Sequence, residues 1–343
     1  GVYWNEYRRA QCFETAPGVY DWRKDAGAMW FVREVTRLGC QEVVLFMCSP
    51  LERMTKNGMA QLTPGTTSNV DPARYPEWAA YACDAAEHFL AQGIPVRYLS
   101  PINEPQWEWS SNNGQEGCHF EPEEIAGVYE AFLTEMQKRP ALAGVELTGP
   151  ESGEWGGRTP EYVGALLDSP ALRAHMNSID CHSYWSNTES KVNFRRWADQ
   201  HCPEKHLRMS EWCEMVHGTD PGMDSALVLA KCVQEDLTVL NAAHWCTWVG
   251  MAPRGYHDGV IHAWQEEDGS VSILPLKRLW AYGNYTRFIR PGFVRVDVSG
   301  GEEFLPVAFS GQNGPQEQLV IVLINDQENP REALLSGNLS QYD

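Results

Sequence analysis

Short apolar runs alternate with helix-like segments from residue 24 to residue 290, and this alternation restricts the chain to few folds. Strands separated by helices of about 10–15 residues predict βαβ units, whose consecutive strands run parallel. Strands are expected at 42–48, 96–102, 145–149, 178–184, 206–211 and 243–249. Helices are expected at 25–38, from Pro76 to Gly93, from Pro122 onwards, and at 161–173, 191–200, 224–240 and 276–289. The pattern therefore predicts an α/β fold with a parallel sheet.

The pattern changes at Pro291. Three short strands, 293–299, 304–310 and 318–324, follow without helices between them, which predicts an antiparallel β segment. We expect residues 1–290 to form a (β/α)8 barrel and residues 291–343 to form the antiparallel segment of a smaller domain beside it. A closed barrel of this class needs eight strands. Because six are found, we expect the barrel to lack its first two strands in this chain.

Composition excludes several classes of function. The formal net charge of −19 repels phosphate backbones, so nucleic acid is not expected as a partner. No apolar run approaches the roughly 18–20 residues of a membrane span. The ten cysteines form no CxxC pair, and the sequence contains neither HExxH nor GxSxG, so neither a metal nor a serine nucleophile is expected. Fourteen Trp and thirteen Tyr fit either a large core or a carbohydrate-binding cleft.

Two glutamates stand at the ends of predicted strands. Glu104 lies in SPINEPQWEW (100–109) and Glu211 lies in RMSEWCEM (208–215). A buried carboxylate is costly unless it is paired, but at the mouth of a parallel barrel it points into the cleft. Two predicted strands separate Glu104 from Glu211, so we expect the carboxylates to face one another across that mouth.

Two opposed carboxylates are the groups that glycoside hydrolysis requires. One is protonated and donates to the leaving oxygen, while the other is ionised and attacks the anomeric carbon. Retention of configuration needs them about 5–5.5 Å apart. We interpret Glu104 as the acid/base, because Asn103 directly before it can hydrogen-bond a sugar 2-hydroxyl, and Glu211 as the nucleophile.

These motifs resemble glycoside hydrolase family 30. The likeness rests on Asn103-Glu104-Pro105, on Ser210-Glu211-Trp212 three strands later and on the aromatic strand 243–249. It extends to SPLERMTKNG (49–58), LTGPESG (147–153), CHSYWS (181–186) and TRFIRPG (286–292), and thus covers nearly the whole chain. The resemblance implies a (β/α)8 barrel with a β-sandwich side domain, a retaining mechanism and no cofactor. It also implies that Glu104 and Glu211 end the fourth and seventh barrel strands, and the segment 106–118 is most similar to members that cut β-1,6-galactan.

Further residues are candidates for binding sugar, each with a structural alternative. Tyr184 is expected to hydrogen-bond the nucleophile or else to be a core tyrosine, and His182 lies two residues earlier on the same face. Trp248 is favoured over Trp245 as the floor of the reactive subsite, because their spacing of three places them on opposite faces of a regular strand. The remaining candidates are Glu151, which could form a loop salt bridge instead, and the platforms Trp107 and Trp109.

The sequence therefore predicts a retaining hydrolase of a β-linked oligo- or polysaccharide, with an endo-β-1,6-galactanase as the first candidate. The alternatives are another specificity of the same family, such as a β-1,6-glucanase, a glucosylceramidase-like enzyme or an exo-β-glycosidase. An alternative of another class is a catalytically silent carbohydrate-binding fragment. Since polysaccharides lie outside cells, we expect the full-length parent to be secreted, although this chain shows no signal peptide.

Overall fold

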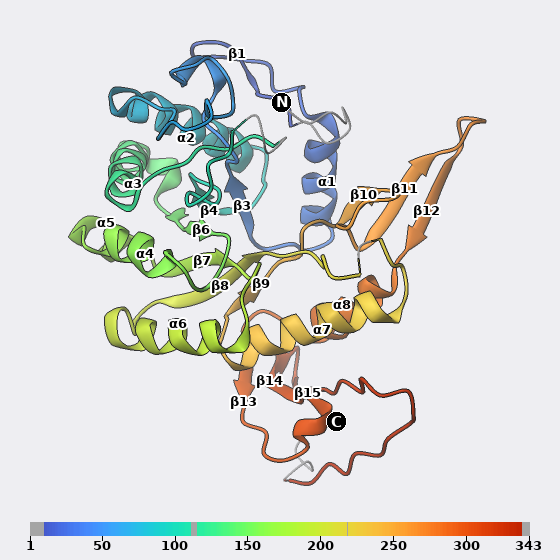
Figure 1. Ribbon diagram of the computed structural model, residues 1–343. Coiled ribbons are helices and arrows are strands. Elements are labelled where there is room, and N and C mark those ends of the chain that lie inside the picture. Colours follow the sequence, from blue (N-terminus) through green and yellow to red (C-terminus); the bar gives the residue numbers. More distant parts are fainter. Residues whose placement is uncertain (1–9, 111–114, 218, 338–343) are drawn as a thin grey trace. The chain divides into compact units, whose positions relative to one another are not determined.

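Figure 1 shows the computed structural model, which describes residues 10–110, 115–217 and 219–337. The chain divides into two compact units, considered separately below. The first unit comprises residues 1–186 and 196–208, and the second comprises residues 187–195 and 209–343. The division crosses two elements, α6 (Thr188–His201) and β8 (His206–Glu211), each of which has residues in both units. The domain boundary expected at residue 290 lies within the second unit and stays a prediction.

The first unit is built from parallel strands covered by helices. Its strands are β1 (Glu14–Ala16), β2 (Val19–Tyr20), β3 (Val43–Phe46), β4 (Val96–Ser100), β5 (Glu146–Leu147), β6 (Pro150–Ser152) and β7 (Ser178–His182). Its helices are α1 (Ala26–Arg37), α2 (Tyr75–Ala91), α3 (Pro122–Gln137), α4 (Thr159–Leu167) and α5 (Pro170–His175), with short 3-10 turns at 52–54, 72–74 and 140–142. Strands β3, β4 and β5 pair in parallel, as do β6 and β7. The α/β class and its parallel pairing are confirmed.

The register of these strands places three leucines side by side in one layer of the core. Leu99 on β4 pairs with Leu45 on one side and with Leu147 on the other. Leu99 and Leu147 are completely buried, together with the inward faces of α2 and α3, which pack side by side in Figure 1. Parallel strands covered on both faces are typically nearly continuous apolar runs; β3 (VVLF) fits this pattern, whereas β4 carries the exposed Arg97.

Local sequence explains where the helices begin and end. Helix α3 begins at Pro122, whose missing N–H is one that the first turn leaves unpaired in any case. Glu121 and Glu124 form a reciprocal capping box around that start. Beyond α1 and α2 stand Gly39 and Gly93, with φ of 100° and 78°, a left-handed conformation that glycine adopts without a steric penalty.

The N-terminal hairpin lies against α2 instead of joining a parallel sheet. Strands β1 and β2 pair antiparallel with each other. Phe13 contacts Phe89 edge to face at 5.7 Å, and Trp22 stacks on His88 at 4.0 Å. Residues 10–23 thus add no strand to the parallel sheets.

The second unit combines two long helices with short sheets. Its elements are α7 (Met223–Thr238), α8 (Lys277–Thr286), β9 (His244–Trp245), β10 (Met251–Pro253), β11 (Ile261–Gln265), β12 (Val271–Pro275), β13 (Val294–Val296), β14 (Val307–Asn313) and β15 (Gln316–Val322), with a 3-10 turn at 302–304. Helices α7 and α8 pack against each other (Figure 1). Strands β13, β14 and β15 form an antiparallel sheet, which confirms the antiparallel segment predicted after Pro291.

Two expectations about these elements were wrong, and one sheet was missed. The helix predicted at 161–173 is two helices, because Pro170 cannot donate a backbone hydrogen bond and its ring clashes with the preceding turn. The strand predicted at 243–249 is regular only over His244–Trp245, so the two-face argument about Trp245 and Trp248 does not apply. The sheet of β10, β11 and β12 was not expected at all.

Among the described residues, no helix combines the length and apolar character that crossing a membrane requires.

Candidate active site

Glu104 lies four residues beyond the end of β4 and has an unusual backbone. Its φ is 42°, in the left-handed region, and the residue is 5% exposed. Its N–H donates to the carbonyl of Glu151 at 2.9 Å, and its own carbonyl accepts the indole N–H of Trp109 at 2.9 Å. The backbone of Trp107 donates to the same carbonyl at 3.2 Å. Backbone bonds on both sides therefore fix the direction in which the Glu104 carboxyl group points.

A buried histidine lies between two carboxyl groups. Nδ1 of His182 is 3.0 Å from Oε1 of Glu104, and Nε2 of the same ring is 3.4 Å from Oε2 of Glu151. His182 is completely buried on β7. Glu151, 1% exposed, also accepts a hydrogen bond from Ser100 at 2.8 Å. His182 and Glu151, both expected to bind sugar, thus lie beside Glu104 in a chain of contacts that runs from one carboxyl group through the ring to the other; their contact with sugar stays a prediction.

Two carboxylates and an imidazole are also donors that divalent metals accept. In the described first unit, however, each ring nitrogen of His182 already lies within 3.4 Å of a carboxylate oxygen. The expectations that the protein uses neither a metal nor another cofactor stay predictions.

Two amide side chains beside Glu104 have buried polar atoms without protein partners. Within the described residues, Oδ1 of Asn103 and both side-chain polar atoms of Gln106 have no hydrogen-bond partner. Buried polar atoms are usually paired, and exceptions at a candidate site mark positions for water or ligand. Asn103 was predicted from the sequence, whereas Gln106 was not, although its place directly after Asn-Glu-Pro is a signal that could have identified it.

The predicted aromatic residues of the first unit differ in exposure. Trp107 is 36% exposed and meets Trp185, 66% exposed, edge to face at 5.3 Å. Trp109 is buried against Gly117, so its indole supports the Glu104 backbone and offers no open platform. Tyr184 is buried, with its ring 5.8 Å from that of His182. Trp185 was missed by sequence reasoning.

Glu211 ends β8, in the second unit, and is half-buried. The carbonyl of Trp212, the next residue, accepts the backbone N–H of Trp248 at 2.8 Å. Trp248 is half-buried, whereas Trp245 is buried and donates its indole N–H to Asp236 at 2.8 Å. This contact favours a structural role for Trp245; the sugar-binding roles of both tryptophans stay predictions.

Glu214 organises the loop that follows Glu211. Its Oε1 accepts backbone N–H groups from Val216 and, at 2.9 Å, from His217. Buried Arg278 lies in the same environment, where burial lowers the pKa of its guanidinium and the negative charge of Glu214 opposes that shift. The second unit therefore holds the segment after the predicted nucleophile by side-chain contacts.

The comparisons with known proteins decide the family. The model for O-glycosyl hydrolase family 30 matches residues 2–262. The chain belongs to glycoside hydrolase family 30.

Relatives of this family 30 chain include enzymes with different substrates in their names. An endo-β-1,6-galactanase of Hypocrea rufa is 29% identical over 122 residues, which cover 35% of this chain and 25% of the galactanase. Glucuronoxylanase XynC of Bacillus subtilis is 23% identical over 282 residues, or 78% of this chain and 58% of the xylanase. The chain thus spans only part of each relative's length.

A solved structure shows the same fold. The crystal structure of a conserved exported protein from Bacteroides fragilis superimposes with a TM-score of 0.78 at 22% identity, covering 92% of this chain and 72% of that one. At this identity the likeness concerns the fold and leaves the substrate undetermined.

The family 30 chain buries a further acidic group on β7. Asp180 on β7 is buried, and this burial raises its pKa to about 7, although Nε of Arg208 at 3.6 Å acts in the opposite direction. Arg208 also lies over the ring of Tyr98, with 3.8 Å between its Cζ and the ring centroid. Asp180 is two residues from His182 on β7, and residues at this spacing lie on the same face of a strand.

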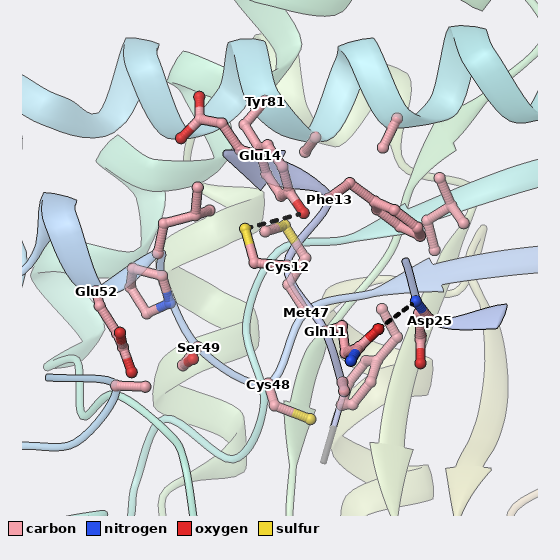
Figure 2. A pocket seen from close by; sticks show the side chains of 18 of the residues that line it. Gln11, Cys12, Phe13, Glu14, Asp25, Met47, Cys48, Ser49, Glu52 and Tyr81 are labelled. Carbon is pink, nitrogen blue, oxygen red and sulfur yellow. Dashed lines mark hydrogen bonds between the residues drawn. The ribbon is translucent and has the colours of Figure 1, made fainter. Parts of the chain in front are cut away.

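The first unit of this family 30 chain also contains an N-terminal cavity of about 640 Å³. It is lined by residues 10–16, the end of β3, residues 49–53 and the inward face of α2, and none of the predicted site residues lines it. In Figure 2, Gln11 accepts the backbone N–H of Asp25, and the Cys12 thiol donates to the Tyr81 hydroxyl. The cavity is therefore separate from the Glu104 cluster.

Proposed function

We propose that this protein hydrolyses β-glycosidic bonds with retention of configuration. Membership of glycoside hydrolase family 30 supports the reaction class. The observation that carries the assignment of the acid is the buried Glu104 carboxyl group, held by His182 beside amides without protein partners.

The proposed chemistry is a double displacement. The Glu211 carboxylate attacks the anomeric carbon while the bond to the leaving oxygen breaks, and that oxygen takes the proton of the Glu104 carboxyl group. A water molecule then attacks the glycosyl-enzyme, Glu104 takes its proton, and the Glu211 ester bond breaks. His182 orients Glu104 throughout, and Asn103 holds the 2-hydroxyl of the reacting sugar.

Single substitutions test both roles. We expect Glu104→Ala and Glu211→Ala each to lose at least about a thousandfold in kcat on polysaccharide, in the range of general acid–base catalysis. Azide added with an activated aryl β-glycoside separates the roles. It should yield the β-glycosyl azide with Glu104→Ala, in which the glycosyl-enzyme still forms, and the α-glycosyl azide with Glu211→Ala. Near-full activity in both variants would contradict the assignment of Glu104 and Glu211 as the catalytic pair.

We propose β-linked galactan, cut internally at β-1,6 bonds, as the substrate. The galactanase relative and the segment 106–118 support this choice. The longer match to a glucuronoxylanase favours a β-1,4-xylan as the second candidate. A panel of β-1,6-galactan, β-1,6-glucan, glucuronoxylan and glucosylceramide, with product sizes measured over time, separates these substrates and distinguishes endo from exo action. Tight sugar binding without turnover would favour the carbohydrate-binding alternative.

We further propose that the parallel strands belong to a (β/α)8 barrel completed by two strands outside these 343 residues. Among the described residues, β3 pairs with β4 and with no other strand, and residues 44–48 line the N-terminal cavity. A protein extended upstream should then show a higher melting temperature and higher kcat than this chain. Equal values for the two proteins would argue against the missing strands.

Secretion of the full-length parent is part of the same proposal. A polysaccharide substrate lies outside the cell, and the protein of similar fold from Bacteroides fragilis is an exported one. Fractionation of the native producer, with activity assayed in medium and cell extract, tests it.

A further inference from the structure

We propose that Gln106, Trp107 and Trp185 form a sugar-binding subsite on the leaving-group side of Glu104. The inference rests on the proposed function and adds to it the residues that recognise the second sugar. It starts from Gln106, whose role the motif analysis did not identify.

The side-chain amide of Gln106 is buried without a partner. Neither its oxygen nor its nitrogen bonds to a described residue, and both atoms are shielded from solvent. An amide offers two donors and an acceptor, so a site that leaves all of them unused loses stability. A sugar ring supplies the missing partners, because adjacent hydroxyls both accept and donate.

Aromatic surface lies next to this amide. Trp107 and Trp185 meet edge to face at 5.3 Å and remain 36% and 66% exposed. Exposed tryptophans of this size in contact with each other are unusual on a surface that has no ligand to bind. Their flat faces match the C–H faces of a pyranose, while the amide matches its hydroxyl edge. The chemical class of the ligand is therefore one sugar unit of a glycan chain.

Three polar groups converge at Gly153 and connect the subsite with the acid. A Cβ placed on Gly153 would lie 2.9 Å from Nε2 of Gln106, 2.9 Å from Oε1 of Glu104 and 3.0 Å from Nε1 of Trp107. Of the two proposed catalytic carboxyl groups, Glu104 is the one that contacts the leaving oxygen. Groups gathered around its carboxyl oxygen are thus placed to contact the leaving-group sugar.

Two substrates separate this role from a structural one. A β-linked oligosaccharide fills the subsite, whereas an activated aryl β-glycoside carries no sugar there. We expect Gln106→Leu and Trp185→Ala each to lower kcat/KM on the oligosaccharide about tenfold or more, and to change kcat/KM on the aryl glycoside less than about twofold. The matched controls are Gln137→Leu, an exposed amide at the end of α3, and Trp30→Ala, an equally exposed tryptophan on α1. Both controls should leave the two substrates unaffected.

The melting temperature provides an independent readout. Removing an amide that has no partner in the free protein should keep the melting temperature of Gln106→Leu at or above that of the parent. A clear fall, with equal losses on both substrates, would show that Gln106 merely supports Glu104 and would overturn the subsite. Unchanged activity on the oligosaccharide would overturn it as well. The proposed function is tested separately, because its failure requires that the parent cleave neither substrate or that Glu104→Ala retain activity.

Discussion

Nδ1 of His182 lies 3.0 Å from Oε1 of Glu104, although 78 residues separate the two in sequence. The contact joins the end of β4 to β7 inside the first unit. The other ring nitrogen faces Glu151, so His182 lies between two carboxyl groups, one of which is that of the proposed acid.

We therefore predict that His182→Ala lowers kcat on polysaccharide about 10-fold to 100-fold, because Glu104 loses its orienting partner. The loss should shrink on an aryl glycoside whose leaving group needs little protonation. His182→Asn, which retains a donor, should recover part of the activity, and His201→Ala, an exposed histidine, serves as control. Equal losses on both substrates would contradict a role in orienting the acid.

Gly153→Ala should impair the acid through crowding. The new Cβ would lie 2.9 Å from the Glu104 and Gln106 side chains, so both must shift. We expect about a tenfold fall in kcat with little change in melting temperature, since side-chain ends move more easily than backbone. Gly164→Ala is the matched control: nothing lies within 4 Å of its Cβ, and alanine within α4 should add about 0.5–1 kcal/mol to the free energy of unfolding.

Asp180 should make stability depend on pH. Its pKa rises from 3.8 to about 7 on folding, so between these values the folded protein binds more protons than the unfolded chain. The free energy of unfolding then falls as pH rises through this window, and no further above it. Asp180→Asn removes this contribution, so its stability relative to the parent should increase by about 1–4 kcal/mol from pH 4 to pH 7, following about 1.4 kcal/mol per pKa unit. Denaturant unfolding at several pH values measures the difference, and a constant difference would refute the prediction.

In the second unit, breaking a buried ion pair should lower the free energy of unfolding more than breaking an exposed one. Nζ of Lys191 is 2.8 Å from Oδ1 of Asp236, whose other oxygen accepts the Trp245 indole N–H. Lys191→Met strands the buried carboxylate and should cost about 3–5 kcal/mol. Lys231→Met breaks an exposed pair with Asp326 and should cost at most about 1 kcal/mol. Similar costs for the two variants in thermal unfolding would disprove the distinction.

The sequence was most informative where local rules act alone. Proline at the start of α3 and glycine after α2 are local signals, and periodicity located the parallel strands near their observed positions. The break at Pro170 and the turn at Asp268-Gly269 between β11 and β12 were local as well, and both were readable but missed.

Contacts between distant residues were beyond sequence reasoning. The sequence indicated that Glu104, His182 and Glu151 matter, but it assigned the latter two to sugar, because no pattern reports that their side chains meet. Likewise, Trp245 was a plausible platform until its indole N–H was found bonded to Asp236, nine residues earlier.

Seven described residues other than glycine adopt left-handed backbone conformations, and Glu104, Trp109, Glu151 and Trp185 are among them. Such a conformation costs on the order of 1–3 kcal/mol, and glycine would relieve it. Laboratory evolution that selects only for thermostability would consequently favour variants in which glycine replaces these residues. Any thermostability screen of this protein therefore needs a turnover assay at every round, or it will enrich robust proteins that no longer cut their substrate.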